Sequence, residues 1–166
     1  KHINEHGGNL YSVDINDYSH LFKKDNWKFI HCSDDDYEKV IKESQKSFDL
    51  ILIDSFHNPQ HVKKLIFHYF DYLKKGGIII IDDISWIPYC KGNYRDHSHT
   101  EIINRDTFSE ILNIISNNRE LIKVHFSFED SGLAKIIKLK NESLKHGPEI
   151  KSRIYSIKNI IKRIIR

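Results

Sequence analysis

Three aspartates follow two short apolar runs in the middle of the chain. Asp54 comes directly after the run from Leu50 to Ile53. Asp82 and Asp83 come directly after the run from Ile78 to Ile81. If these runs are neighbouring parallel strands, the carboxylates meet at one sheet edge, because adjacent strands lie about 5 Å apart. Oxygen ligands suit Mg²⁺ or a similar divalent ion, so the spacing predicts a metal site on the three acids. The alternative is that one acid caps a turn and the others face water.

His57 follows Asp54 by three residues, in the loop above the same predicted edge. An ordinary imidazole changes its charge near neutral pH, so a histidine here can act as a general base. A cation beside it would bind a substrate hydroxyl and make its proton easier to remove. The position predicts that His57 and Asp54 take part in catalysis on an oxygen nucleophile. The alternative is that His57 is a polar loop residue, one of 11 histidines in the chain.

Two further strand ends carry residues suited to binding a nucleoside. Asp14 lies near the end of a predicted strand, Leu10 to Ile15, that follows a Gly-Gly turn. A carboxylate at this place in dinucleotide-binding folds accepts hydrogen bonds from ribose hydroxyls. Ser33 and Asp34 follow the predicted strand from Trp27 to Cys32, and we expect Asp34 to lie near the adenine. The alternatives are a solvated strand-end acid at Asp14 and, after the second strand, acids that favour a helix start.

Short apolar strands that alternate with amphipathic helices would position these acids. Unbroken Ile and Leu runs are typical of strands covered on both faces. Between the two acidic strand ends, Asn58 can cap a helix, Pro59 suits its first turn, and Gly76-Gly77 can end it. The apolar face of this helix would consist of Val62, Leu65, Ile66, Tyr69 and Leu73.

The order of the elements predicts an α/β fold with a Rossmann-like, mainly parallel sheet, helices on both faces and a C-terminal antiparallel hairpin. Strands are predicted over Leu10 to Ile15, Trp27 to Cys32, Leu50 to Ile53, Ile78 to Ile81, Leu121 to Phe128 and Leu133 to Leu139. The other predicted helices are Ser33 to Ser44, Thr107 to Asn117 and Glu149 to Arg166. Ser33 and Asp36 have the spacing of a capping box at the start of the first of them.

Length and composition are typical of one soluble globular domain. The chain has 166 residues, which suit a single core, and a net charge of +3, which is too small to imply a nucleic-acid partner. Two cysteines are too few for a disulfide scaffold, and no apolar run reaches the about 20 residues of a membrane span. We therefore expect a cytoplasmic protein without a transmembrane segment. The chain has no methionine and begins at Lys1, so we expect it to be part of a longer protein.

A basic amphipathic helix is expected in residues 141–166, outside an α/β domain of residues 1–140. Its isoleucines share one broad face: Ile150, Ile154, Ile157, Ile160, Ile161, Ile164 and Ile165. Its lysines and arginines lie elsewhere around the helix. Such a helix suits a membrane surface or a nucleic acid. It also suits packing on its own protein or on a second subunit, and this interpretation, which allows a homo-oligomer, is the one we favour.

Three stretches together resemble the class I S-adenosylmethionine-dependent methyltransferases: YSVDI, FDLILIDSFHN and LKKGGIIIIDDISW. They are most similar to the metal-dependent branch that includes the catechol, caffeoyl-CoA and sugar O-methyltransferases. The resemblance implies transfer of a methyl group from S-adenosylmethionine to a hydroxyl of a small molecule or sugar. It implies cofactor contacts at Asp14, Ser33, Asp34 and Asp54, Mg²⁺ ligands at Asp54, Asp82 and Asp83, and a catalytic role for His57 and Asp54.

One part of the family pattern is absent from these residues. The family's first strand and its glycine-rich loop, which holds the methionine part of the cofactor, have no counterpart in the sequence. In that fold the first strand lies between the strands that end at Asp14 and Asp54. We expect a segment before Lys1, or another chain, to supply it. The acceptor is expected to contact that segment and the loop from Pro88 to Thr100.

Two other functions fit parts of the sequence. In a Rossmann-type oxidoreductase Asp14 would hold the ribose of NAD, but hydride transfer has no use for the acid pair Asp82-Asp83. In a non-catalytic binding module the α/β core would be inert and the basic helix would bind a partner. Affinity for S-adenosylhomocysteine, for NADH or for neither distinguishes the three.

Overall fold

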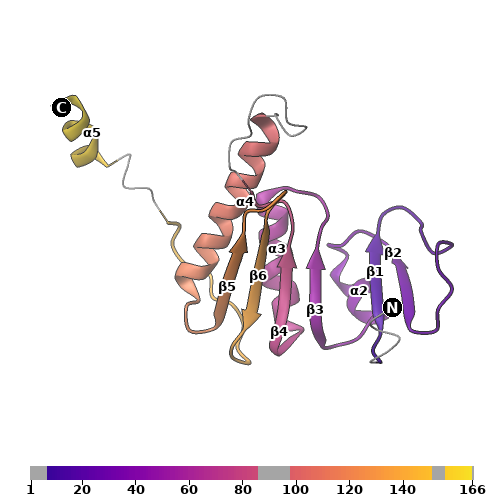
Figure 1. The fold of residues 1–166 in the computed structure, drawn as a ribbon. Coiled ribbons are helices and arrows are strands. Elements are labelled where there is room, and N and C mark those ends of the chain that lie inside the picture. The colour runs from indigo at the N-terminus through magenta and orange to yellow at the C-terminus, as the bar shows by residue number, and fades with distance from the viewer. Residues whose placement is uncertain (1–6, 86–97, 151–155, 166) are drawn as a thin grey trace.

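Six strands and four helices make up the described part of the chain (Figure 1). The structure, a computed structural model, describes residues 7–85, 98–150 and 156–165. The strands are β1 (Leu10–Asp14), β2 (Trp27–His31), β3 (Phe48–Ile53), β4 (Leu73–Ile81), β5 (Ile122–Ser127) and β6 (Leu133–Lys138). The helices are α2 (Tyr37–Glu43), α3 (Pro59–Asp71), α4 (Ser98–Asn117) and α5 (Ile157–Ile164).

The strands pair as the sequence predicts, in parallel until the last two. β1 pairs with β2 in parallel, and β3 pairs with β4 in parallel. β6 then pairs antiparallel with both β4 and β5. The α/β fold with a parallel part and a C-terminal antiparallel hairpin is thus confirmed. The division of the chain at residue 140 stays a prediction.

The sheet is in two pieces, β1-β2 and β3-β4-β6-β5. β1 and β3 run in the same direction and face each other in Figure 1, but no ladder joins them. The Ile53 carbonyl accepts a hydrogen bond from the Asp82 amide on the β4 side. The backbone N–H and C=O groups of successive residues in a strand point to alternate sides. Those of Leu50 and Leu52 therefore point away from β4, toward β1. The two unpaired edges therefore lie where the family's first strand is expected.

α3 and α4 lie together behind the four-stranded sheet (Figure 1). α3 buries Val62, Leu65, Ile66, Tyr69 and Phe70, close to the predicted apolar face. They join Ile79 of β4 and Ile136 of β6, which are completely buried, in one hydrophobic core. On the opposite face of β3, Leu50 and Leu52 stay 55% and 60% exposed. The helices therefore cover the face that carries Ile53 and Ile79.

Several predicted helix boundaries are wrong. α4 begins at Ser98 rather than at Thr107, and α5 begins at Ile157 rather than at Glu149. α2 begins at Tyr37, and its N-cap is Asp36, whose carboxylate accepts the Lys39 amide at 3.3 Å, so Ser33 does not cap it. α3 has the predicted N-cap, Asn58, but ends at Asp71 rather than at the glycine pair. Gly76-Gly77 instead lies within β4, which begins at Leu73 because its first residues pair with the start of β3.

Candidate active site

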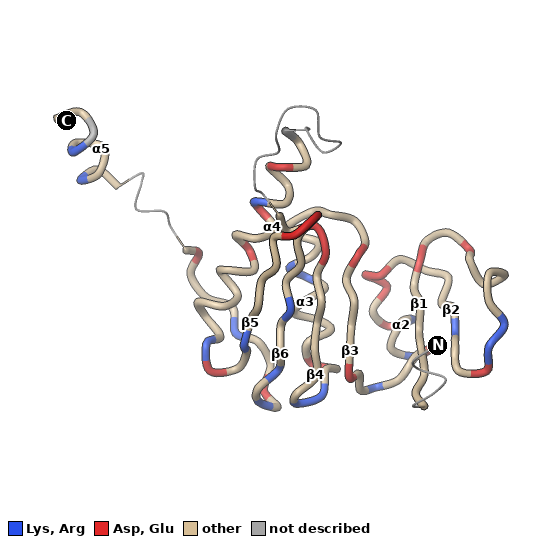
Figure 2. Tube along the Cα trace, in the orientation of Figure 1, with Lys and Arg blue, Asp and Glu red and all other residues tan. Residues whose placement is uncertain are grey.

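Three acids lie at the carboxyl ends of β3 and β4, where the sequence predicts them. Asp54 directly follows β3, and Asp82 and Asp83 directly follow β4. The Asp82 amide donates to the Ile53 carbonyl at 3.1 Å, so the ladder between the two strands continues up to the acids. Figure 2 shows acidic segments gathered at this end of the sheet. Ligands of open α/β sheets bind at this edge.

His57 lies between two of these acids. Its Nε2 is 3.2 Å from Asp83 Oδ2 and 3.9 Å from Asp54 Oδ1. All three side chains remain partly exposed, so a substrate can reach them. Asp83 has a positive φ of 57°, an uncommon conformation for an aspartate, and the turn it makes presents its carboxylate to His57. The structure thus brings together His57, Asp54 and Asp83.

Asp82 has different partners. Its Oδ1 accepts the Ser131 hydroxyl at 2.8 Å and the Asp83 amide at 2.7 Å. Ser131 belongs to the turn between β5 and β6, which reaches over the end of β4. Among the described residues, no three acid, histidine or cysteine side chains form a metal-binding group. The carboxylate oxygens are chemically suited to Mg²⁺, but those of Asp54, Asp82 and Asp83 do not surround one point.

Asp34 is held from two sides by α3. Its carboxylate oxygens lie 3.0 Å and 3.2 Å from His61 Nε2, and its carbonyl accepts the Tyr69 hydroxyl at 2.6 Å. Burial raises the pKa of Tyr69 well above its ordinary value, and the Asp34 charge adds to this, so the hydroxyl remains a donor. Ser33 donates its hydroxyl to Asp35 Oδ1 at 2.6 Å. The predicted adenine segment is therefore fixed in place by contacts with α3.

Asp14 is the last residue of β1, at the carboxyl end of that strand. Its Oδ1 accepts the Asn16 amide at 2.8 Å, which closes a local turn, and its carbonyl accepts the Cys32 amide at 3.0 Å. Neither contact involves Oδ2, so this oxygen can accept a ligand hydroxyl. Asp14, Asp34, Asp54 and the acid pair after β4 thus follow the carboxyl ends of four strands that all take part in parallel pairs.

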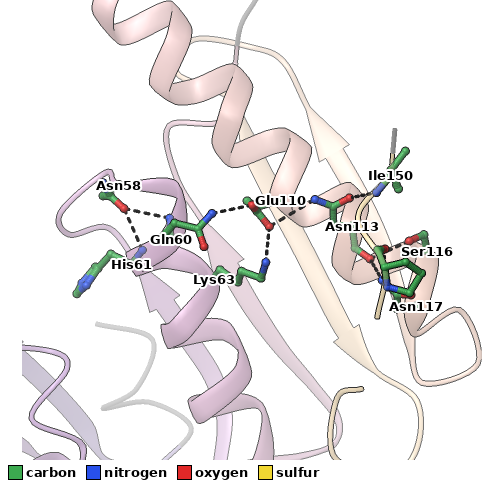
Figure 3. A network of polar contacts seen from close by, with 10 residues as sticks. Asn58, Gln60, His61, Lys63, Glu110, Asn113, Ser116, Asn117 and Ile150 are labelled. Atoms are coloured by element: carbon green, nitrogen blue, oxygen red, sulfur yellow. Dashed lines mark hydrogen bonds and ion pairs between the residues drawn. The ribbon is translucent and has the colours of Figure 1, made fainter. Parts of the chain in front are cut away.

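A polar network ties the start of α3 to α4 (Figure 3). Asn58 Oδ1 caps α3 by accepting the Gln60 amide at 3.0 Å and the His61 amide at 3.2 Å. Gln60 donates to Glu110 Oε1 at 2.7 Å, and Lys63 Nζ lies 2.9 Å from Glu110 Oε2. Burial alone would raise the pKa of Glu110, but these hydrogen bonds and the Lys63 charge outweigh it and lower that pKa. The helix turn that carries His61 is therefore anchored.

Three residues that contact the acids were not identified from the sequence: His61, Tyr69 and Ser131. Tyr69 lies on the predicted apolar face of α3. The helical spacing therefore predicts that its ring is buried, but it does not predict the contact of its hydroxyl with Asp34. His61 and Ser131 meet Asp34 and Asp82 across 27 and 49 residues of chain. No local pattern in a single sequence marks such pairs.

Two surface hollows lie away from the acids. One, of about 650 Å³, is lined by the start of β4 and by Lys138 at the end of β6, which is the opposite end of the sheet. The other is lined by α2 and α3, with Tyr37, His68 and Tyr72 on its walls. Neither includes Asp14, Asp34, Asp54 or the acids after β4, so the candidate site rests on the side-chain geometry at the strand ends. Residues 86–97 of the predicted acceptor loop lie outside the described residues.

Several solved structures share the fold. The Podospora anserina methyltransferase PaMTH1, bound to SAH, matches with a TM-score of 0.61 and 16% identity over 80% of this chain and 61% of its own. The MycE methyltransferase of the mycinamycin biosynthetic pathway, in complex with Mg and SAH, matches with a TM-score of 0.57 and 22% identity over 81% of this chain and 38% of its own. A Staphylococcus aureus protein provisionally named a caffeoyl-CoA O-methyltransferase matches with a TM-score of 0.57 and 18% identity over 78% of this chain and 64% of its own.

The chain therefore spans less than two thirds of the length of these three structures. No curated protein sequence matches it. A family described as a methyltransferase domain matches residues 1–84, which include β1 to β4 and the aspartates at or after the ends of these strands. The chain belongs to this methyltransferase domain family.

Proposed function

We propose that the chain is the catalytic part of an S-adenosylmethionine-dependent methyltransferase that acts on a hydroxyl of a small molecule or sugar. The observation that carries the proposal is the grouping of His57 with Asp54 and Asp83 at the carboxyl ends of β3 and β4, with Asp14 and Asp34 at the carboxyl ends of β1 and β2. Membership of the methyltransferase family supports the reaction type. The SAH in the PaMTH1 and MycE structures supports the cofactor.

The residues divide into a cofactor side and an acceptor side. Asp14 would accept hydrogen bonds from the ribose, and Ser33 and Asp34 would border the adenine. Asp54, at the end of β3, would lie between the two sides and contact both. His57 would accept the proton of the acceptor hydroxyl, and Asp83, 3.2 Å away, would orient the imidazole and stabilise it once protonated.

The transfer itself is a direct displacement. The acceptor oxygen forms a bond to the methyl carbon as the bond from that carbon to the cofactor sulfur breaks. The hydroxyl proton passes to His57, and the products are a methyl ether and S-adenosylhomocysteine. Holding the oxygen, carbon and sulfur in line supplies most of the rate enhancement, since the reaction needs little other chemistry from the protein.

A divalent cation is part of the proposal. The oxygen donors of Asp54, Asp82 and Asp83 would hold it, and they fit Mg²⁺ in type. When bound, the ion would supply Lewis-acid help to the acceptor hydroxyl. Asp82 would have to exchange its contact with Ser131 for the ion. Removal of divalent ions with EDTA should then abolish activity, and Mg²⁺ should restore it. Undiminished turnover in EDTA would refute a metal requirement without affecting the methyl-transfer assignment.

The glycine-rich loop of the family would fit beside the unpaired edges of β1 and β3. A strand between them would satisfy the backbone groups of Leu50 and Leu52 and lead into a loop next to Asp14 and Asp54. The strand would come from a longer form of the protein or from another chain. Its presence would complete the pocket for the methionine part of the cofactor.

Calorimetric titration with S-adenosylhomocysteine and, separately, with NADH tests the cofactor class. We expect S-adenosylhomocysteine to bind and NADH not to bind. Asp14→Ala should weaken the binding at least tenfold because the ribose loses its acceptor, whereas Asp49→Ala, an exposed acid at the other end of β3, should leave it unchanged. Binding of NADH instead, or of neither ligand in a form that contains the glycine-rich loop, would overturn the proposal.

A further inference from the structure

α5 presents an apolar stripe to solvent. Ile157, Ile164 and Ile165 are 77%, 79% and 79% exposed, and Ile160 and Ile161 are about half exposed. None of them belongs to the hydrophobic core, and Figure 1 shows α5 standing apart from the sheet and from the other helices. A row of exposed isoleucines is unfavourable in water, so its presence indicates a surface that covers it.

Positive charge accompanies this stripe. Lys158 and Lys162 are exposed beside this stripe. Residues 149–166 contain six basic residues and one acidic residue, a net charge of +5. The whole chain carries only +3, so the other 148 residues together carry −2. The net positive charge of the chain therefore comes from its last 18 residues.

We propose that α5 binds the surface of a membrane that contains anionic lipids. Its isoleucines would enter the boundary between headgroups and acyl chains, while Lys158 and Lys162 would contact the lipid phosphates. An eight-residue helix is about 12 Å long, far short of the about 30 Å of a hydrocarbon core, so it would lie in the plane of the membrane. In keeping with this orientation, no helix in the described ranges is long and apolar enough to cross a membrane.

The positive charge of Lys158 and Lys162 favours a membrane over the other possible partners of the isoleucines. A second copy of α5 could cover the isoleucines, but it would bring its own lysines close to those of the first copy. A nucleic acid would attract the lysines but leave the isoleucines in water. An anionic bilayer matches the isoleucines and the lysines at once. This interaction would add membrane recruitment to the proposed methyl transfer and is independent of it.

Sedimentation of the full chain with lipid vesicles tests the proposal. Vesicles of phosphatidylcholine with 30% phosphatidylglycerol, a fraction on the order of that in anionic membranes, should bind at least tenfold more tightly than phosphatidylcholine alone. High salt should weaken the binding because it screens the lysines. The double variants Ile161→Ser/Ile164→Ser and Lys158→Glu/Lys162→Glu should each lose most of it.

Matched variants elsewhere serve as controls. Ile102→Ser removes an exposed isoleucine of α4, and Lys23→Glu/Lys24→Glu makes the same charge change far from α5; both should bind like the wild type. Equal binding to neutral vesicles would overturn the proposal. Absence of vesicle binding would also overturn it. In that case, a dimer that Ile161→Ser/Ile164→Ser dissociates would show that the stripe binds a second copy. Binding of an oligonucleotide that survives the same isoleucine change would show that the lysines bind nucleic acid.

Discussion

At the scale of single residues, the contact between His57 and Asp83 bears most directly on the proposed proton transfer. Asp83 needs a left-handed backbone to make it, and Asp54 lies on the other side of the same imidazole. Exchanging the imidazole for an amide keeps the size of the side chain and removes the base. The consequences should appear in catalysis rather than in folding.

His57→Gln should lower kcat about 100-fold or more, the usual contribution of a general base, with little change in S-adenosylhomocysteine affinity. Asp83→Asn should have a smaller effect because the imidazole remains. Steady-state kinetics and calorimetry on the two variants provide the measurement. A His57→Gln enzyme within threefold of the wild-type kcat would show that another group takes the proton.

Tyr69 should contribute a part of the folding stability that is lost at alkaline pH. Burial raises its pKa above the ordinary 10.0, so the folded state holds the hydroxyl proton more tightly than the unfolded state. The stability from this group is fully present below pH 10.0 and is lost as the pH rises toward its folded pKa. Tyr69→Phe should cost about 1 kcal/mol at neutral pH, from the lost hydrogen bond to Asp34, and should show a flatter decline above pH 10.0.

Urea unfolding at a series of pH values measures this effect. Tyr11→Phe, a change in a partly exposed tyrosine of β1, is the control. Parallel alkaline curves for wild type and Tyr69→Phe would contradict the assignment of the shift to Tyr69.

At the scale of secondary-structure elements, α3 holds Asp34 through His61 and Tyr69, and α4 supports α3. The support is polar and partly buried: Lys63 and Glu110 are 26% and 13% exposed. By contrast, the ion pair between Lys74 and Asp49 is 49% and 76% exposed. Exposed pairs contribute little to stability, whereas hydrogen-bonded pairs that are shielded from water contribute more.

Glu110→Gln should therefore destabilise the fold by about 1 kcal/mol, and Asp49→Asn should change it by less than about 0.5 kcal/mol. The pKa of Glu110 is lowered in the folded state. Its contribution to folding stability is therefore present above its ordinary pKa of 4.5 and is lost as the pH falls below that value. The difference between wild type and Glu110→Gln should thus shrink in acid. Thermal unfolding at neutral and acid pH measures it, and a constant difference would be inconsistent with the shift.

The turn between β5 and β6 is a second support for the acidic edge. Gly132 has a φ of +78°, and a Cβ there would lie 2.5 Å from the Ser85 backbone nitrogen. The turn also contributes Ser131, whose carbonyl accepts the Ser85 amide and whose hydroxyl reaches Asp82. A side chain at Gly132 would push this turn away from the end of β4.

Gly132→Ala should cost about 2 kcal/mol or more, from the left-handed backbone and the clash together. Gly76→Ala has a similar φ of +83° but open space around it, so it should cost only about 1 kcal/mol. The difference between the two midpoints in urea isolates the clash. Equal costs would mean that the turn can move without penalty.

At the scale of the whole molecule, the division of the sheet predicts uneven stability. β3, β4, β6 and β5 form one continuous ladder over the main core, whereas β1 and β2, among the strands that the structure describes, pair only with each other. A two-stranded unit is marginal by itself, so it should open more readily than the larger sheet.

Amide hydrogen exchange should therefore be faster in β1 and β2 than in β4 and β6. The amides of Leu50 and Leu52, which face the unpaired edge, should exchange faster than those of Ile51 and Ile53 on the same strand. S-adenosylhomocysteine should slow exchange at the ends of β1 and β3 if both contact it. Uniform protection over all six strands would refute the division.

The sequence by itself determined where along the chain the strands lie, the parallel pairing and the placement of the acids at the strand ends. These features follow from local causes. The unbroken apolar runs specify strands, although Leu50 and Leu52 on one face of β3 stay exposed, and Asn58-Pro59 specifies the start of α3. The end of α3 was not predictable. The local propensity of Gly76-Gly77 favours a helix stop, but the pairing of this segment with β3 makes it part of a strand.

Only the tertiary structure decided which side chains meet. His61 reaches Asp34 because the loop between β2 and α2 lies against α3, and Ser131 reaches Asp82 because the hairpin returns over β4. Such contacts depend on packing between segments far apart in sequence, which a local pattern does not encode. The acids predicted as one metal group thus divide, with Asp54 and Asp83 beside His57 and Asp82 turned to Ser131.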